Sequence, residues 1–275
     1  MKLAIALLVS HGFPAPSEFW DSYEAVMHHI RSGAANQLLP PELQITDIRR
    51  IKATSFPVDL ARNDIVRSFL DQGSESHLVF MDADMTFPPD WIPRLLLHDV
   101  PVISARYHMR KPPYHPCFYV KHRVAEGPHT YAPVHYGQGL IEIERGGAGA
   151  LIVRRDVFEA IRFRIGDNWF RYQRGPSDPF DMSVSEDFWF YRAAREAGYA
   201  CYGDWDVECL HLQTMAIDRS WNQAYLDGQV RELPTMTPEA RQTVLNSLVV
   251  CGFPDGMSLP TGDHIPPYVL SPGER

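Results

Sequence analysis

The stretch Val79-Phe80-Met81-Asp82-Ala83-Asp84-Met85-Thr86-Phe87-Pro88-Pro89 carries most of the information about this chain. Residues 77–81 form an apolar run of strand length that stops at Asp82, and a turn with two prolines follows. Two carboxylates clustered where a strand ends repel each other unless a cation lies between them. All-oxygen ligation suits Mg²⁺ or Mn²⁺, which also favour phosphate oxygens. The stretch therefore predicts a divalent metal site at Asp82 and Asp84, with a structural turn as the alternative.

Strand-like and helix-like segments alternate on both sides of this stretch. We expect strands near residues 3–9, 43–51, 77–81, 100–105, 150–153 and 200–207. We expect helices near 17–31, 59–72, 91–96, 155–162, 186–197 and 237–248, with N-caps at Ser17, Asp59, Asp90, Ser185 and Thr237. This alternation predicts an α/β fold with a mainly parallel sheet flanked by helices, and such sheets bind ligands at the carboxyl ends of their strands.

Composition excludes several classes of protein. The 275 residues are 45% hydrophobic and 22% charged, which suits a globular chain and neither a disordered nor a fibrous one. No run approaches 18 apolar residues, so we expect no membrane-spanning helix. The apolar start is interpreted as a buried strand, because no signal-peptide cleavage site follows it. The four cysteines form no C-x-x-C pair and fit a reducing compartment, which predicts a cytoplasmic protein.

Charge is unevenly distributed along the chain. The net charge is −8, yet residues 101–175 carry twelve basic and six acidic residues. Residues 106–123 contain no acidic residue, and their aromatic side chains could stack on sugars or bases. The basic residues of this segment are Arg106, Arg110, Lys111, Lys121 and Arg123. They would suit an anionic acceptor such as a lipid phosphate or a nucleic acid, and a solvated basic face is the alternative.

Four short motifs follow one another along the chain. They are Ala61-Arg62-Asn63 with Asp82-Ala83-Asp84, Gly146-Gly147-Ala148-Gly149 before an apolar run, Ser185-Glu186-Asp187-Phe188-Trp189-Phe190 at a helix start, and His211 after a strand. In this order they resemble a nucleotide-sugar-dependent glycosyltransferase of the GT-A fold, near family 2. The resemblance covers roughly residues 1–215. It implies a Rossmann-like GT-A domain there, with a nucleotide-binding half (1–105), an acceptor-side half (106–215) that holds an irregular insertion, and a C-terminal helical and extended segment (216–275) packed on it.

The resemblance also implies an activity and its cofactors. The chain would be a hexosyltransferase-type enzyme that moves a sugar from a UDP- or GDP-sugar to a hydroxyl acceptor with inversion. Asp84 would hold Mn²⁺ or Mg²⁺, aided by Asp82 through water or the ribose, and His211 would be a further ligand. The metal would neutralise the charge that grows on the departing diphosphate.

Roles for the other motif residues follow from the same resemblance. Arg62 and Asn63 would contact the nucleotide or diphosphate, although Arg62 could instead be a surface ion-pair residue. Gly147 and Gly149 would permit close approach of a sugar or acceptor, or a positive φ. Asp187 would be the general base, with Glu186 as the second choice. The alternative for this acidic pair is that the helix dipole favours acids in a first turn.

Two other functions stay open at this point. A sugar-phosphate nucleotidyltransferase would need a glycine-rich, basic phosphate loop after the first strand, and Ser10-His11-Gly12-Phe13 contains a single glycine. A non-catalytic GT-A-like module would bind a carbohydrate or nucleotide without turnover. Metal-dependent release of nucleoside diphosphate distinguishes an enzyme from such a module.

Overall fold

A computed structural model of the chain describes residues 1–9, 15–53, 57–110, 113–122, 130–173 and 184–213. The chain divides into two compact units, Met1–Gln213 and Thr214–Arg275, and every described residue belongs to the first. The helix expected near 237–248, with its cap Thr237, lies outside the described residues, as does the loop at 10–13. The domain boundary after residue 215 and the packing of 216–275 stay predictions.

Helices and strands alternate through most of the described unit. The strands are β1 (Lys2–Leu8), β2 (Asp47–Ala53), β3 (His77–Asp82), β4 (Met85–Thr86), β5 (Val102–Arg106), β6 (Phe118–His122), β7 (Thr130–Pro133), β8 (Leu140–Ile143), β9 (Arg145–Gly146), β10 (Ala150–Arg154), β11 (Cys201–Glu208) and β12 (Leu210–His211). The helices are α1 (Ser17–Arg31), α2 (Ala34–Leu38), the 3-10 helix η1 (Pro41–Leu43), α3 (Val58–Gln72), α4 (Trp91–Leu96), α5 (Arg155–Ile165) and α6 (Glu186–Glu196). The described helices are all too short or too polar to traverse a lipid bilayer.

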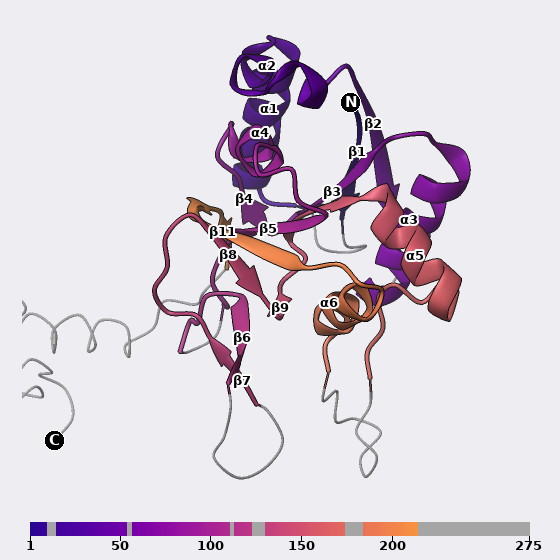
Figure 1. The fold of residues 1–275 in the computed structure, drawn as a ribbon. Coiled ribbons are helices and arrows are strands. Elements are labelled where there is room, and N and C mark those ends of the chain that lie inside the picture. Colours follow the sequence, from indigo (N-terminus) through magenta and orange to yellow (C-terminus); the bar gives the residue numbers. More distant parts are fainter. Residues whose placement is uncertain (10–14, 54–56, 111–112, 123–129, 174–183, 214–275) are drawn as a thin grey trace, which may run out of the picture. The chain divides into compact units, whose positions relative to one another are not determined.

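A seven-stranded mixed sheet with the order β2-β1-β3-β10-β5-β11-β8 forms the centre of the unit (Figure 1). Strands β2, β1, β3, β5 and β11 run in one direction, while β10 and the edge strand β8 run in the other. The expected α/β fold, with a mainly parallel sheet flanked by helices, is confirmed. The antiparallel β10 between β3 and β5 was not expected, because an apolar run carries no signal for strand direction.

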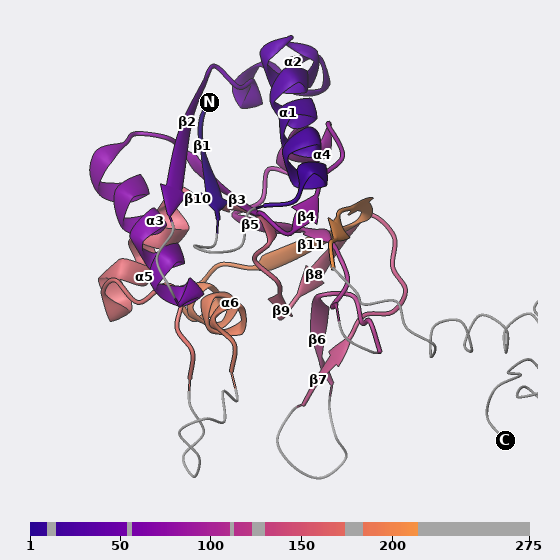
Figure 2. The same ribbon diagram turned by 180° about the vertical axis from the view of Figure 1, so that it is seen from behind.

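Helices cover both faces of this sheet, as the two opposite views show (Figures 1 and 2). Helices α1, α2 and α4 pack on one face and α3, α5 and α6 on the other. Strand β1 is buried on both faces. Leu3, Ile5 and Leu7 face the layer of α1, α2 and α4, and Ala4 and Ala6 face the layer of α3, α5 and α6. A strand buried on both faces reads as a continuous apolar run, which is the pattern in the sequence.

Helix starts agree with the expected N-caps in part. Ser185 caps α6, since the backbone N–H of Phe188 donates to its hydroxyl at 3.3 Å. The expected caps at Ser17 and Asp59 are wrong, because Pro16 and Pro57 occupy the N-cap positions of α1 and α3. Asp90 has the N-cap position of α4 without a capping hydrogen bond. The strand expected at 43–51 begins only at residue 47, after η1.

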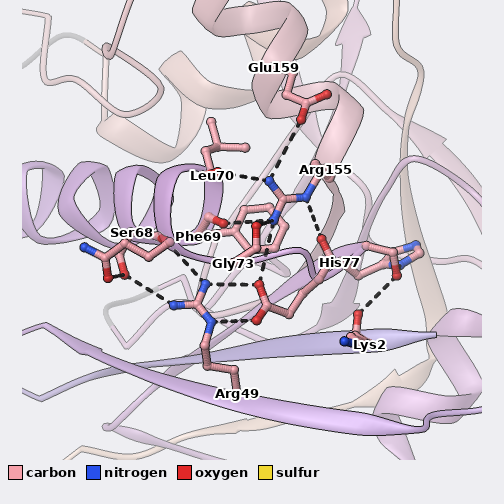
Figure 3. Close-up of polar contacts among 12 residues, drawn as sticks. Lys2, Arg49, Ser68, Phe69, Leu70, Gly73, His77, Arg155 and Glu159 are labelled. Atoms are coloured by element: carbon pink, nitrogen blue, oxygen red, sulfur yellow. Dashed lines mark hydrogen bonds and ion pairs between the residues drawn. The ribbon is translucent and has the colours of Figure 1, made fainter.

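The C-terminal end of α3 is held by two arginines (Figure 3). Arg155 donates to the carbonyls of Phe69 at 2.8 Å and Gly73 at 3.0 Å, which are among the free carbonyls that every helix end leaves. Its guanidinium also lies over the Phe69 ring at 4.3 Å. Arg49 from β2 donates to the carbonyl of Ser68 in α3 at 3.3 Å and forms a bidentate pair with Glu75 at 2.6 and 3.0 Å. These contacts fix α3 against the sheet, and α3 carries part of the candidate site.

Candidate functional site

The candidate site lies where β3 ends, at the carboxyl edge of the parallel strands. The backbone N–H of Asp82 donates to the carbonyl of Gly149 at 2.9 Å, and that of Ala83 donates to Leu8 at 3.3 Å. Strand β10 begins here, because it runs antiparallel and pairs Ala150 with Met81. The structure therefore brings the Asp82-Ala83-Asp84 turn next to Gly146-Gly147-Ala148-Gly149, which we call the glycine loop.

Arg62 from α3 is the centre of a buried ion cluster at this edge. Its side chain is only 3% exposed and donates to Asp82 at 2.9 Å and to Glu186 at 2.6 Å. It also donates to Asp187, the neighbouring acid in the first turn of α6. The surface ion-pair alternative for Arg62 is wrong, because the side chain is buried. One cation thus faces three carboxylates from two separate elements.

Burial and mutual repulsion change the proton affinity of this cluster. Burial raises the pKa of Asp187 to about 8, with a further rise from Glu186 and Asp82. The Arg62 charge and a hydrogen bond from the Ala148 backbone oppose that rise. Burial likewise raises the pKa of Asp82 despite its pairing with Arg62. The cluster is short of positive charge, and additional positive charge nearby would stabilise its ionised form.

Asp84 belongs to a second group of side chains. The pairing of β4 with β12 sets Met85 opposite His211, and the backbone N–H of Leu212 donates to the Asp84 carbonyl at 2.7 Å. The Nε2 atom of His211 lies 3.6 Å from an Asp84 carboxylate oxygen. The Nδ1 atom of His211 lies 2.9 Å from the carbonyl of His108, to which it must donate because a carbonyl only accepts. In the neutral ring, Nε2 therefore carries the lone pair that faces Asp84.

The pair of Asp84 and His211 fits a divalent cation by the chemistry of its donors. A carboxylate oxygen and an imidazole nitrogen, oriented by a backbone carbonyl, are ordinary Mn²⁺ ligands. Arg110 occupies the same carboxylate, with Nη1 at 2.8 Å from Asp84. Within the described residues, no group of three His, Cys, Asp or Glu side chains is arranged to hold a metal ion. Asp82 faces Arg62, so any further ligands would come from substrate oxygens or water.

Tyr107 was not identified from the sequence, yet it links the two groups of side chains through contacts with the glycine loop and with His211. Its hydroxyl accepts a hydrogen bond from the Gly149 backbone at 3.1 Å, and its ring lies edge-on to His211 with centroids 5.6 Å apart. A Cβ on Gly147 would lie 1.8 Å from this hydroxyl, and one on Gly149 would lie 3.0 Å from Asp82. Neither glycine has a positive φ. Both glycines permit a close approach: the group nearest to Gly147 is Tyr107, and the group nearest to Gly149 is the Met85 sulfur.

Asn63 has a different environment from its neighbour Arg62. Its amide nitrogen donates to the Phe170 carbonyl at 2.8 Å, and its amide oxygen accepts from the Phe170 backbone at 2.9 Å. The residue is 8% exposed, and these two bonds engage both ends of its side-chain amide. Asn63 thereby holds the segment after α5 against α3, while its expected contact with a nucleotide stays a prediction.

A pocket of about 260 Å³ adjoins the second group. His211 and Arg110, the two partners of Asp84, both border it. The residues that line it are His108, Met109, Arg110, Tyr114, Cys209, Leu210, His211 and Gln213.

The basic segment 106–123 is less cationic in the structure than in the sequence. Arg106 pairs with Glu208 at 3.1 Å, and Lys121 pairs with Glu144 at 3.4 Å. Arg110 pairs with Asp84, as described above. Lys111 and Arg123 lie outside the described residues. The described cations of this segment are therefore each matched by a carboxylate.

Comparisons with known proteins give structural similarity at low identity. No family model matches the chain, and no curated protein matches its sequence. A197 from STIV has 13% identity and a TM-score of 0.44, with 80% of this chain and 97% of that chain covered. GalNAc-T7 with UDP, GalNAc and Mn²⁺ has 9% identity and a TM-score of 0.47, with 82% of this chain and 47% of that chain covered.

The catalytic domain of Drosophila β1,4-galactosyltransferase 7 in complex with xylobiose is also similar. It has 15% identity and a TM-score of 0.43, with 78% of this chain and 71% of that chain covered. The chain spans about half the length of GalNAc-T7 (47%) and nearly all of A197 (97%). Identities and TM-scores at this level do not assign the chain to a family.

Proposed function

We propose that this chain is a glycosyltransferase that moves a sugar from a UDP- or GDP-sugar to a hydroxyl acceptor, with Mn²⁺ or Mg²⁺ as cofactor. One observation carries the proposal: at one sheet edge, Tyr107 contacts His211, which faces Asp84, and also contacts the glycine loop, whose Ala148 backbone donates a hydrogen bond to the partly buried carboxylate of Asp187. Such an edge holds a proton acceptor and cation ligands at once, which transfer from a nucleoside diphosphate requires.

Asp84 and His211 would hold the metal ion in this proposal. When bound, the ion would supply positive charge to the diphosphate as the bond to the sugar breaks. Asp82 would contact the ribose or a metal-bound water, and Asn63 would lie on the nucleotide side. The backbone of Gly147 and Gly149, against which Tyr107 packs, would approach the donor sugar closely.

Asp187 would accept the proton of the attacking hydroxyl, with inversion at the anomeric carbon. A raised pKa favours this role, because a base with a pKa near the working pH takes up a proton readily. Exposure favours Asp187 over Glu186, since 22% of the Asp187 side chain is accessible against 8% for Glu186. Arg62 contacts both acids and would hold Asp187 in place while Glu186 stays buried.

The test is release of nucleoside diphosphate from UDP- and GDP-sugars with Mn²⁺, Mg²⁺ or EDTA. We expect metal-dependent release that Asp84→Asn abolishes and that Asp187→Asn lowers by about 10²–10⁴ in kcat. Asp47→Asn is the control, because Asp47 is an exposed acid on β2. Mn²⁺ should also raise the melting temperature of the wild type and not that of Asp84→Asn.

Two results would overturn the proposal. Donor binding without turnover in any metal would favour a non-catalytic binding module. Formation of a nucleotide sugar from a nucleoside triphosphate and a sugar phosphate would favour a nucleotidyltransferase. A cytoplasmic location is part of the proposal, and the free thiols of Cys117, Cys201 and Cys209 support it.

A further inference from the structure

Arg145 on β9 is a partly buried cation held by aromatic rings. Its guanidinium carbon lies 3.3 Å from the centroid of the Tyr131 ring and 5.1 Å from that of Phe188. Within the described residues, it has neither a hydrogen-bond acceptor nor an ion-pair partner. The stacked rings fix the plane of the guanidinium and leave its N–H donors at the edge for another group.

The rings around Arg145 form one continuous surface. In the β7-β6-β9 sheet, Tyr119 pairs with Arg145 and Lys121 pairs with Tyr131, so these side chains share one face. Phe188 from α6 closes this face, with its ring 5.0 Å from that of Tyr119 at 71°. We name this surface, made of Tyr119, Tyr131, Arg145 and Phe188, the arginine platform.

The arginine platform lies next to the proposed base. Phe188 follows Asp187 directly in α6, and the backbone of Ala148, three residues after Arg145, donates a hydrogen bond to the Asp187 carboxylate. Strand β9 lies between β6 and α6 in both views (Figures 1 and 2). A molecule stacked on the platform would therefore lie beside the helix turn that carries Asp187.

The charge of the platform indicates which anion it fits. Arg145 contributes one unmatched positive charge, and Lys121 on the same face already pairs with Glu144 at 3.4 Å. A single guanidinium matches the single charge of a carboxylate, whereas a phosphate monoester carries up to about two charges at neutral pH. Ring faces beside the cation suit the apolar face of a sugar.

Building on the proposed function, we propose that the arginine platform binds the acceptor and that this acceptor is a saccharide with a carboxylate group, a uronic acid. Arg145 pairs with the carboxylate, and the rings stack on the sugar. In the transfer, the acceptor oxygen forms a bond to the anomeric carbon of the donor. The bond from that carbon to the diphosphate oxygen breaks, the nucleoside diphosphate leaves with the electron pair, and Asp187 takes the hydroxyl proton.

The experiment measures binding without donor or metal, by calorimetry and ligand-observed NMR. The probes are methyl β-glucuronide, methyl β-glucoside and glucose 6-phosphate. We expect the glucuronide to bind the wild type about tenfold more tightly than the glucoside, which corresponds to one charge-assisted contact. Arg145→Gln should remove this preference.

Arg192→Gln is the matched control, because Arg192 also stacks on an aromatic ring of α6, Trp189, at 4.3 Å. It should keep the preference for the glucuronide. Arg145→Lys keeps the charge without the planar fork and should keep only part of the preference. Melting curves of all three variants will show whether each is folded.

The outcomes separate this inference from the proposed function. Equal affinity for glucuronide and glucoside, or tighter binding of the phosphate, would overturn the uronic-acid assignment even if nucleoside diphosphate release is observed. Loss of the glucuronide preference in folded Arg145→Gln would support the platform even if no donor is turned over. Unchanged preference in folded Arg145→Gln would overturn the role of Arg145.

Discussion

Replacement of Arg62 by methionine tests the buried ion cluster most directly. Methionine has a similar length and no charge, so Asp82, Glu186 and Asp187 would lose their shared cation. Removal of one partner from a buried ion pair costs about 3–5 kcal/mol of folding free energy. We expect Arg62→Met to lower the free energy of unfolding by this amount at pH 7.5.

The pH dependence of this loss follows from linkage. Without Arg62, one more carboxylate of the cluster should hold a proton in the folded state at neutral pH, while unfolded carboxylates titrate near pH 4. The folded variant then binds one more proton than the folded wild type. The difference in unfolding free energy between wild type and variant should therefore shrink by about 1.4 kcal/mol for each pH unit below 7.5.

The assay is urea unfolding followed by circular dichroism at pH 7.5, 6.5 and 5.5. Arg67→Met is the control on the same helix, because the Arg67 side chain is 44% exposed and its partners Asp64 and Asp167 are 50% and 32% exposed. It should cost no more than about 1 kcal/mol, independent of pH. A loss of similar size for both variants, or a loss for Arg62→Met that does not change with pH, would refute the buried cluster.

Three further predictions concern the glycine loop, the sheet and the base. Gly147→Ala should lower the free energy of unfolding by about 1–3 kcal/mol and reduce nucleoside diphosphate release, because its Cβ would displace Tyr107; unchanged melting and activity would contradict this packing. Burial lowers the pKa of His77 to about 4. The free energy of unfolding should therefore fall by up to about 3 kcal/mol as the pH falls from 6.5 through 4. In acid denaturation, His77→Gln should lack this loss. Burial raises the pKa of Asp187 to about 8, so kcat/KM should rise from pH 6 and level off above about pH 8, whereas a flat profile would argue against this base.

Much of the fold could be predicted from apolar runs and caps. The run at 77–81 and the run at 150–153 are both strands, and Ser185 marks the start of α6. The direction of β10 could not be predicted, because strand direction depends on which edge the preceding loop reaches. The starts at Pro16 and Pro57 were missed because a nearby Ser or Asp is also a good capping residue.

The candidate site could be predicted less well than the fold. Asp82 and Asp84 lie at the end of β3 as expected, but they face different partners, Arg62 and His211. The packing of α3 on the sheet determines which carboxylates pair with Arg62. Sequence spacing does not predict that packing. Tyr107 contacts Gly149, and Arg145 contacts Phe188. The two residues of each pair are more than 40 positions apart in the sequence, so sequence spacing does not predict these contacts.

The placement of β10 between β3 and β5 has a consequence for how the protein is made. A nascent chain that ends at residue 106 already contains β3 and β5, yet the strand that joins them has not been synthesised. Both would present open, apolar edges, which invite association with other chains. The two sequence halves therefore complete one sheet together, and we expect a fragment of residues 1–106 to aggregate when expressed alone.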